Sequence, residues 1–221
     1  MAPERIRKGE NMKILYEDKN VVVVLKPPEI LSQFSETEEN AVTILREQTG
    51  SEIFVVSRLD RNVGGVMVFG KNQKAAADLT RQMQNGEFRK EYIAAVRGKP
   101  EKNQGIFQDL LFKDSRKNKS FVVKKERKGV KKASLEYEVL CSDNEISIVK
   151  IRLHTGRTHQ IRVQFASRKM PLVGDGKYGA KDNCKNMGLF CREVTFRKIN
   201  SEESMTFSAE PENIYPWTVS E

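Results

Sequence analysis

Short apolar runs separated by turns are the feature that most constrains how this chain of 221 residues can fold. The first two runs flank a turn at 17–20, and Lys26-Pro27-Pro28 must then leave the sheet, because proline has no backbone N–H to donate. From Gly105 onward the runs alternate in character, as half-buried strands do. The sequence therefore predicts strands within 15–26, 53–56, 66–70, 88–96, 135–140, 146–153, 189–197 and 204–207.

Helical spacing is found in three segments. The first covers 41–49 and is followed by Gly50, a residue suited to the left-handed conformation after a helix. In the second, Asn72 can cap a helix that reaches Asn85 and stops at Gly86. The inward face of this second helix is predicted to carry Ala76, Leu79 and Met83.

The third helix is predicted over 158–168, with Thr158 as its N-cap and with Ile161 and Phe165 packing inward one turn apart. Because strands outnumber helices, we expect an α+β fold with a central, largely antiparallel or mixed sheet flanked by a few helices and loops. We also expect a single domain over 14–221, after a short charged N-terminal extension at 1–13.

Basic residues outnumber acidic ones by 39 to 30, which gives a formal net charge of +9 and favours a polyanionic partner. Residues 113–132, here called the lysine-rich arm, hold ten Lys or Arg and only two acids. Such a run is often a solvated loop, but the apolar residues 121–123 inside it indicate a hairpin or strand that carries lysines. We expect the arm to contact the phosphates of a nucleic acid through Lys124, Lys125, Lys128, Lys131 and Lys132.

Cysteine usage and hydropathy exclude several classes of protein. Cys141, Cys184 and Cys191 are odd in number and lack CxxC spacing, so neither a disulfide framework nor a zinc site is expected. No apolar segment approaches the ~20 residues needed to cross a bilayer. We therefore expect a cytoplasmic protein without a membrane partner and, since no heptad pattern is present, a monomer.

Residues 57–65 place one carboxylate, Asp60, between Arg58 and Arg61 and just before a glycine pair that opens an apolar run. An aspartate beside guanidinium groups stays ionised at neutral pH, so Asp60 is interpreted as a nucleophile or base. The alternative is a surface ion pair ahead of a strand.

A second block, residues 154–162, contains both histidines of the chain and two arginines. At a helix N-terminus, Arg157 and free backbone amides can hold a phosphate, while Arg162 can reach a carboxylate on another loop. His159 has no neighbouring nucleophile and no partners at metal-ligand spacing, so a structural hydrogen bond is its expected role and no metal site is predicted.

With these motifs the chain resembles the RluA-type RNA pseudouridine synthases over about 14–211. Four blocks carry the resemblance in the family's order: Arg-Leu-Asp-Arg at 58–61, Lys-Glu-Tyr-Ile-Ala-Ala-Val-Arg-Gly at 90–98, Thr-Gly-Arg-Thr-His-Gln-Ile-Arg at 155–162, and Pro-Leu-Val-Gly-Asp at 171–175 with Tyr-Gly at 178–179. The resemblance implies a pseudouridine synthase-like fold with a basic active-site cleft. We expect the catalytic domain alone, without an N-terminal S4-type RNA-binding domain.

The resemblance also implies roles for individual residues. Asp60 would be the catalytic aspartate, Arg162 would pair with it, and Tyr92 would stack on the target uracil. Without the family, a buried strand tyrosine would be the preferred interpretation of Tyr92. Arg58 would fill the space left when the uridine leaves its stack. The remaining RNA contacts are expected from Arg61, Arg157, His159 and the arm lysines.

The implied reaction converts uridine to its C-glycoside isomer without a cofactor or metal. Asp60 could attack C1′, add to the uracil ring or remove a ribose proton, and the sequence does not choose among these routes. Three residues depart from the family pattern: Ser57 stands where histidine is usual, and Val63 and Gly64 where threonine and serine are common. Altered activity or substrate choice is an open consequence of these departures.

Two other functions are compatible with parts of the sequence. A noncatalytic protein that binds structured RNA would explain the charge but not the acid among arginines. A metal-dependent nuclease would need several carboxylates around Mg²⁺, whereas these motifs offer one. For the enzyme, ribosomal RNA is the first expectation for the substrate and transfer RNA the second, and both rest on the family alone.

Overall fold

The computed structural model describes residues 11–182 and 184–218, which form two compact units. Of the described residues, unit 1 contains 11–90 and 190–212, and unit 2 contains 91–182, 184–189 and 213–218. The chain passes from unit 1 to unit 2 within strand β5 (Arg89–Arg97) and returns within β10 (Leu189–Arg197). The residues expected to form one catalytic domain over 14–221 fall into two compact units, and the single domain stays a prediction.

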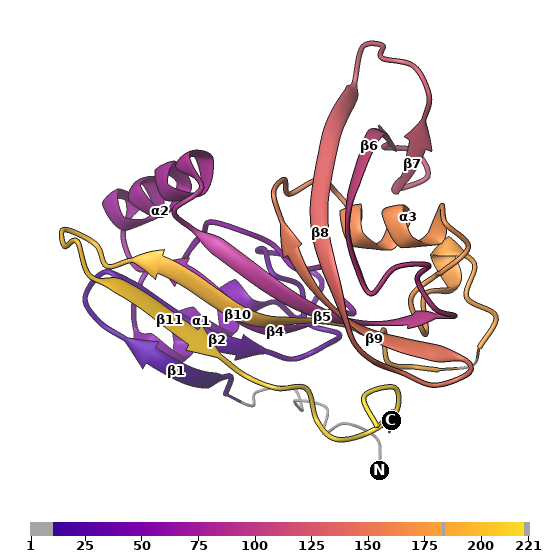
Figure 1. Ribbon diagram of the computed structural model, residues 1–221. Helices are drawn as coiled ribbons and strands as arrows, with labels where there is room; N and C mark the ends of the chain where they lie inside the picture. The colour runs from indigo at the N-terminus through magenta and orange to yellow at the C-terminus, as the bar shows by residue number, and fades with distance from the viewer. Residues whose placement is uncertain (1–10, 183, 219–221) are drawn as a thin grey trace. The chain divides into compact units, whose positions relative to one another are not determined.

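Unit 1 is built on a mixed sheet with the order β1-β2-β4-β10, in which β10 runs parallel to β4 and the other pairs are antiparallel. Strand β11 pairs with β10, and the short β3 pairs with β4. Figure 1 shows the yellow strands β10 and β11, from late in the sequence, in one sheet with the indigo and purple β1, β2 and β4. The strands are β1 (Lys13–Glu17), β2 (Val21–Lys26), β3 (Phe54–Val55), β4 (Gly64–Gly70) and β11 (Ser204–Ser208).

The core of unit 1 lies around its two central strands. Residues 21–24 of β2 and 66–69 of β4 are fully buried without alternation, because both faces of these strands are covered. Part of the expected N-terminal extension also belongs to this unit. Met12 is buried, and the Gln48 side chain bonds both its N–H and its carbonyl, at 3.0 and 2.9 Å. Residues 1–10 lie outside the described residues.

Both helices predicted for unit 1 are confirmed, α1 at Ala41–Thr49 and α2 at Gln73–Asn85. The Asn72 side chain accepts the N–H of Ala75 and caps α2, as predicted. Gly50 and Gly86 end the two helices in the left-handed conformation, with φ of 63° and 76°. These ends were predictable because caps are set by local chain chemistry.

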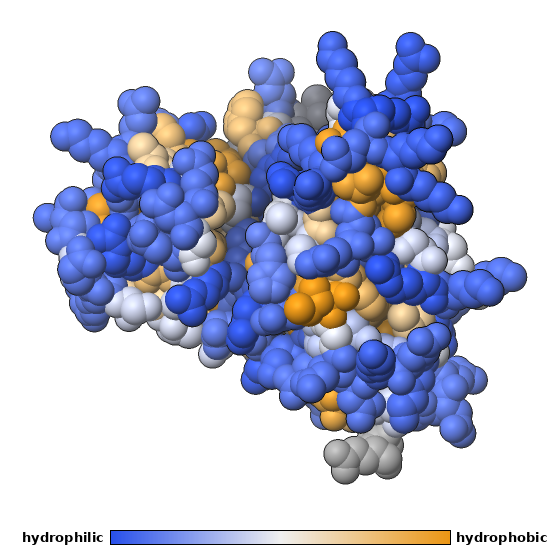
Figure 2. All heavy atoms as spheres, turned by 45° about the horizontal axis from the view of Figure 1, so that its top comes forward, coloured by the Kyte–Doolittle hydropathy of each residue, from blue (hydrophilic) through white to orange (hydrophobic). Residues whose placement is uncertain are grey.

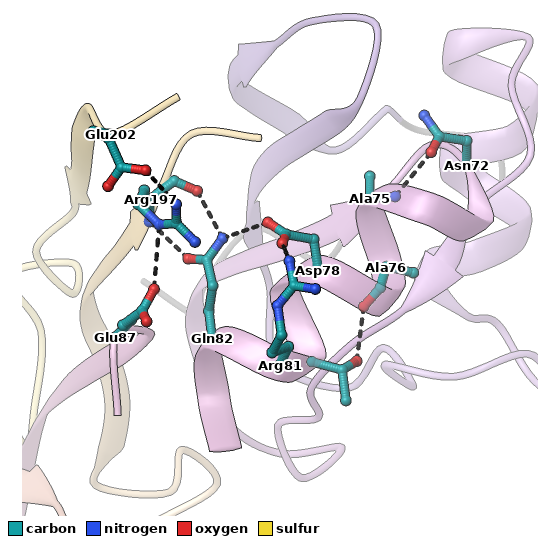
Figure 3. Close-up of polar contacts among 10 residues, drawn as sticks. Asn72, Ala75, Ala76, Asp78, Arg81, Gln82, Glu87, Arg197 and Glu202 are labelled. Atoms are coloured by element: carbon teal, nitrogen blue, oxygen red, sulfur yellow. Dashed lines mark hydrogen bonds and ion pairs between the residues drawn. The ribbon is translucent and has the colours of Figure 1, made fainter. Parts of the chain in front are cut away.

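The predicted inward face of α2 was partly wrong. The buried residues are Ala75, Leu79 and Gln82, whereas Ala76 and Met83 are only half-buried. Gln82 can lie in the core because its amide bonds both backbone groups of Arg197 on β10: Nε2 donates to the carbonyl at 2.9 Å, and Oε1 accepts the N–H at 2.7 Å. Figure 3 shows this pair of bonds and a third from Nε2 to Asp78. A polar side chain whose hydrogen bonds are all made inside the protein can therefore occupy a core position that was expected to be apolar.

Unit 2 has an antiparallel sheet with the order β5-β9-β8-β6-β7. Its further strands are β6 (Gln104–Asp114), β7 (Lys119–Val123), β8 (Val130–Ser142) and β9 (Ile146–Leu153). The lysine-rich arm consists of the end of β6, the whole of β7 and the start of β8, which confirms a hairpin that carries lysines (Figure 1). The mixed and antiparallel strands of the described residues, together with the three α-helices, give the α+β fold that was expected.

The third helix, α3, is shorter than predicted and spans Gln160–Ala166. Thr158 is not its N-cap. The Gln160 side chain accepts hydrogen bonds from the Arg157 N–H at 3.0 Å and from the Thr155 hydroxyl at 2.7 Å, and it donates from Nε2 to the Ser134 carbonyl on β8 at 3.0 Å. The turn at 155–159 is therefore held both by local contacts and by β8. The inward packing of Ile161 and Phe165 is confirmed, since both are buried.

In the described part of the chain, no helix is long and apolar enough to cross a membrane.

Candidate active site

Asp60 lies in the loop between β3 and β4 and is half-buried. Its carbonyl accepts the N–H of Val63 at 3.0 Å and closes a turn over 60–63. Before it, Leu59 is buried and both its backbone groups bond the Ser32 hydroxyl. The acid is therefore presented on a loop whose backbone is fixed on both sides of it.

Lys26 lies beneath this loop and is fully buried. Its ammonium donates to the carbonyls of Pro27, Ile30 and Arg61, at 2.7, 2.8 and 3.3 Å. Burial lowers the pKa of Lys26 to about 7, against the opposing charges of Asp60 and Glu29. The buried Lys26 amine thus links the end of β2 to the Asp60 loop by hydrogen bonds, and its charge interacts with that of Asp60.

The two arginines beside Asp60 are exposed and have other partners. Arg58 donates to the Gln33 side-chain oxygen at 2.8 Å. Arg61 forms an ion pair with Glu38 and donates from Nε to the Glu29 carbonyl at 3.2 Å. Arg61 therefore has a carboxylate other than Asp60 at its guanidinium, and a phosphate would have to compete with that exposed pair.

The glycine pair after Asp60 is explained by a close neighbour, strand β10. Gly65 has a φ of +131°, and a Cβ there would lie 2.3 Å from the Cys191 carbonyl oxygen. A Cβ on Gly64 would meet the Pro28 Cδ at 3.2 Å, so a serine at this position would press on the Pro28 ring. The departure from the family pattern at Gly64 thus fits the proline that follows β2.

Arg162 on α3 is buried and binds the carboxylate of Asp175 through two hydrogen bonds. Nε donates to Oδ2 at 2.7 Å and Nη2 to Oδ1 at 2.8 Å, and the Asp175 side chain is completely buried. The Tyr178 ring covers the guanidinium, with its centroid 5.1 Å from Cζ. Planar, bidentate pairing fixes the orientation of an arginine as well as its charge.

The neighbours of Arg162 on the motif differ in exposure. His159 is half-buried, and its Nδ1 lies 3.0 Å from the Tyr178 hydroxyl, which agrees with the expected structural hydrogen bond. Arg157 is exposed and donates from Nε to the Lys132 carbonyl at 3.0 Å. The N–H groups of Arg157 and Gln160 are bonded within the turn and do not face a ligand, and the phosphate site expected here stays a prediction.

Tyr92 lies on β5 within unit 2 and is buried, in register with Ile151 on β9. This burial is compatible with both interpretations of the residue, a core tyrosine and a ring offered to a base. The five arm lysines, by contrast, are all exposed. Figure 2 shows long hydrophilic side chains projecting from much of the face it draws, with small hydrophobic patches between them.

Among residues 11–182 and 184–218, no three His, Cys, Asp or Glu side chains gather as a metal site would require. The groups that stand as candidates for chemistry are the acid of the Asp60 loop and the arginine of α3, each held by the contacts of its own unit.

Residues 20–167 match the family model described as RNA pseudouridylate synthase. The chain belongs to this family. The match includes Asp60, Tyr92 and Arg162, and it confirms the resemblance recognised from the four motifs.

Relatives and solved structures agree with this membership. The chain is 37% identical over 190 residues to an uncharacterized RNA pseudouridine synthase of Aquifex aeolicus, covering 80% of this chain and 59% of the relative. It is 34% identical over 181 residues to the ribosomal large subunit pseudouridine synthase D of Borreliella burgdorferi, covering 76% and 55%. It thus spans less than two thirds of these curated relatives.

The fold is also that of human RNA pseudouridylate synthase domain containing 1. The TM-score is 0.79 at 21% identity, with 98% of this chain and 89% of that chain covered. A likeness at this identity concerns the architecture of the family rather than its substrates.

For this pseudouridylate synthase family member, the motifs identified the acid and the arginine but missed the residues that hold them. Asp175 and Tyr178 stand in the fourth motif, yet nothing in their spacing indicates that they contact Arg162. In the sequence, Lys26 was noted only as the residue before two prolines. The structure shows that it is buried and that it bonds the Asp60 loop at the Arg61 carbonyl. Ser32 had no sequence signal, because its contact with Leu59 spans 27 residues.

Proposed function

We propose that this protein isomerises uridine to pseudouridine in structured RNA, without a cofactor or metal, using the Asp60 carboxylate. The observation that supports this most is the match of residues 20–167 to the RNA pseudouridylate synthase family. Large-subunit ribosomal RNA is the proposed substrate, because relatives similar to this chain are named ribosomal large subunit pseudouridine synthases D and C. Transfer RNA is the second candidate.

The reaction exchanges one glycosidic bond for another. The N1–C1′ bond breaks, the detached uracil turns, and C5 bonds to C1′. The C5 hydrogen then leaves as a proton and N1 gains one, so no electrons are exchanged with a cofactor. Asp60 acts at C1′, at the uracil ring or at a ribose proton, and each route needs the ionised carboxylate.

In this proposal Arg162 faces the carboxylate of Asp60 and keeps it ionised, while Tyr92 stacks on the everted uracil. Asp175 engages the Nε–Nη2 edge of Arg162, which supports the role by presetting the guanidinium. Arg58 is exposed, as a residue that fills the vacated stack must be. Eversion costs a few kcal/mol, which stacking and phosphate contacts offset.

The lysine-rich arm supplies the phosphate contacts. Lys131 and Lys132 lie on β8, and Lys124, Lys125 and Lys128 lie in the segment 124–129 that connects β7 to β8. Both of these strands pair with β6, so the segment is anchored at each end. Binding to phosphates releases counterions and gains affinity without base readout. Recognition of the target uridine then rests on RNA shape and stacking.

The test is tritium release from RNA labelled at uridine C5, with ribosomal and transfer RNA transcripts as separate substrates. We expect wild-type protein to release tritium, and Asp60→Ala and Asp60→Asn to lose turnover while keeping most of their RNA affinity. Glu212→Gln, an exposed acid near the C-terminus, is the matched control and should behave as wild type. Equal release by wild type and both Asp60 variants would remove Asp60 from the mechanism.

Two further results separate the rival functions. Full isomerisation in EDTA would exclude a required divalent metal, whereas strand cleavage abolished by EDTA would indicate a nuclease. Tight RNA binding with no tritium release from any substrate would leave a noncatalytic binder on the same fold.

A further inference from the structure

Tyr178 makes two sets of contacts that the proposed chemistry does not use, one with Arg162 and one with the start of β7. It ends the short 3₁₀ helix η1 (Gly176–Tyr178), three residues after Asp175. One ring face is near the Arg162 guanidinium, at 5.1 Å, and the ring also lies 4.9 Å from the Lys119 ammonium at the start of β7. Its hydroxyl contacts Ser120 and His159.

On the first side, Tyr178 and Asp175 complete the setting of Arg162. Asp175 holds one edge of the guanidinium in its plane, and the Tyr178 ring covers a face. A guanidinium between a buried carboxylate and an aromatic ring loses most of its rotational freedom before substrate arrives. Preorganisation of this kind acts on the rate rather than on RNA affinity.

On the second side, Tyr178 and its neighbours fasten the base of the lysine-rich arm. The Ser120 N–H donates to the Tyr178 hydroxyl at 2.8 Å, and the Ser120 hydroxyl donates to the Thr158 carbonyl at 2.7 Å. Lys119 donates to the Lys177 carbonyl, and Lys177 to the Asn118 carbonyl. The start of β7 is therefore bonded both to η1 and to the turn before α3.

The hydrogen bonds of the Tyr178 hydroxyl are those of a protonated phenol. Because the hydroxyl oxygen accepts the Ser120 N–H, its own hydrogen is available to donate to His159 Nδ1 at 3.0 Å. Burial raises the pKa of the Tyr178 phenol, so it remains protonated at neutral pH.

We propose that Tyr178 is a positioning residue that couples the lysine-rich arm to Arg162, so that RNA bound by the arm and the catalytic guanidinium share one anchor. The inference rests on the proposed function for the role of Arg162. The coupling itself rests on the contacts within unit 2, which are open to measurement without turnover.

The kinetic test measures single-turnover isomerisation at saturating RNA, RNA affinity and thermal midpoint for wild type, Tyr178→Phe and Tyr178→Leu. We expect Tyr178→Leu to slow the reaction by about a hundredfold and Tyr178→Phe by about tenfold, with RNA affinity changed by less than about threefold. Tyr137→Phe is the matched control, a buried tyrosine of the same unit whose hydroxyl bonds the Lys102 carbonyl, and should keep the wild-type rate.

A double-mutant cycle tests the coupling to the arm. Lys119→Ala alone should slow the saturated rate, and should have little further effect in the Tyr178→Leu background, because Lys119 acts through the ring. Full additivity of the two changes would overturn the coupling, as would wild-type rates in both Tyr178 variants of an active enzyme.

A spectroscopic arm separates failure of this inference from failure of the proposed function. In protein labelled with ¹⁵N-arginine, the Arg162 Nε–H signal, assigned through Arg162→Lys, should shift and broaden in Tyr178→Leu and remain sharp in Tyr137→Phe. This outcome is expected even if no RNA is isomerised. An unmoved Arg162 signal overturns the positioning role, and if Tyr178→Leu does not fold, the rate and spectrum of Tyr178→Phe decide the question.

Discussion

The Ser32 hydroxyl satisfies both backbone groups of Leu59, the residue directly before Asp60. It donates to the Leu59 carbonyl at 2.8 Å and accepts the Leu59 N–H at 3.0 Å. Both residues are buried, so the two backbone groups depend on this one side chain. The position of the proposed catalytic loop is therefore set from a segment 27 residues earlier.

Replacing Ser32 by Ala should lower the free energy of unfolding by about 1–3 kcal/mol, because a buried N–H and C=O lose their partner. Urea denaturation measures the change. Ser115→Ala, at an exposed turn, should shift the midpoint little. If Ser32→Ala unfolds at the wild-type urea concentration, the hydroxyl does not hold the loop.

Gly65→Ala should be more damaging than an ordinary glycine replacement. The new Cβ would lie 2.3 Å from the Cys191 carbonyl in addition to adopting a φ of +131°, so β4 and β10 must separate. We expect a loss of about 3 kcal/mol or more in the free energy of unfolding, or no soluble protein.

Gly86→Ala measures the cost of the positive φ alone, without the clash that an added Cβ meets at Gly65. Gly86 also has a positive φ, but an added Cβ meets no atom of the described residues within 4 Å. Its cost should be near 1 kcal/mol, as for one residue held in the left-handed region. Similar thermal midpoints for Gly65→Ala and Gly86→Ala would show that β4 and β10 can move apart at little cost in stability.

The elements that the sequence predicted well are those decided by local chemistry. Asn72 and Gly86 bound α2 because a side-chain cap and a left-handed glycine act within a few residues. Most strands were recognised from their apolar runs, but β6, over Gln104–Asp114, was not among the predicted ranges, β3 contains only two residues and β8 extends over thirteen. Alternation and turn residues locate a strand better than they locate its ends.

Features decided by distant partners were not predictable. Gln82 lies three residues after Leu79, on the inward face by helical spacing, but its polarity predicts exposure. Its buried position depends on Arg197, which lies 115 residues away. α3 begins only after His159, which has a φ of 54°, and the Thr158 carbonyl before it accepts the hydroxyl of Ser120, 38 residues earlier. Sequence patterns over a few residues cannot predict contacts of this length.

The candidate site shows the same division. The motifs located Asp60 and Arg162, but Asp175, only 13 residues beyond Arg162, received no role. Sequence spacing did not show that the turn after α3 folds back onto its guanidinium. The supporting residues of a site belong to tertiary structure even when they stand within recognisable motifs.

The lysine-rich arm should determine the salt dependence of RNA binding. Alanine at Lys124, Lys125, Lys128, Lys131 and Lys132 together should weaken binding and flatten the plot of log affinity against log salt, by roughly 0.7–0.9 for each phosphate that a lysine no longer neutralises. Matched replacements at Lys19 and Lys74, which lie in unit 1, should leave the slope nearly unchanged. An unaltered slope in the arm variant would mean that the arm does not contact RNA.

Lys26 predicts an unusual pH dependence of stability. Its pKa is about 7 in the folded protein and near 10.5 when the chain is unfolded. Between these values the unfolded state binds one more proton, so the free energy of unfolding rises with pH by up to about 1.4 kcal/mol per unit. Below pH 7 both states are protonated, and the full cost of burying the charge is present.

Lys26→Met removes this titration, so wild type should gain stability relative to the variant as the pH rises from 7 to 10. Urea denaturation of both proteins across that range measures the difference. Lys74→Met, at an exposed position on α2, should give a curve parallel to wild type. If the Lys26→Met curve is also parallel, Lys26 keeps its proton throughout, and the three carbonyls that accept its hydrogen bonds outweigh its burial.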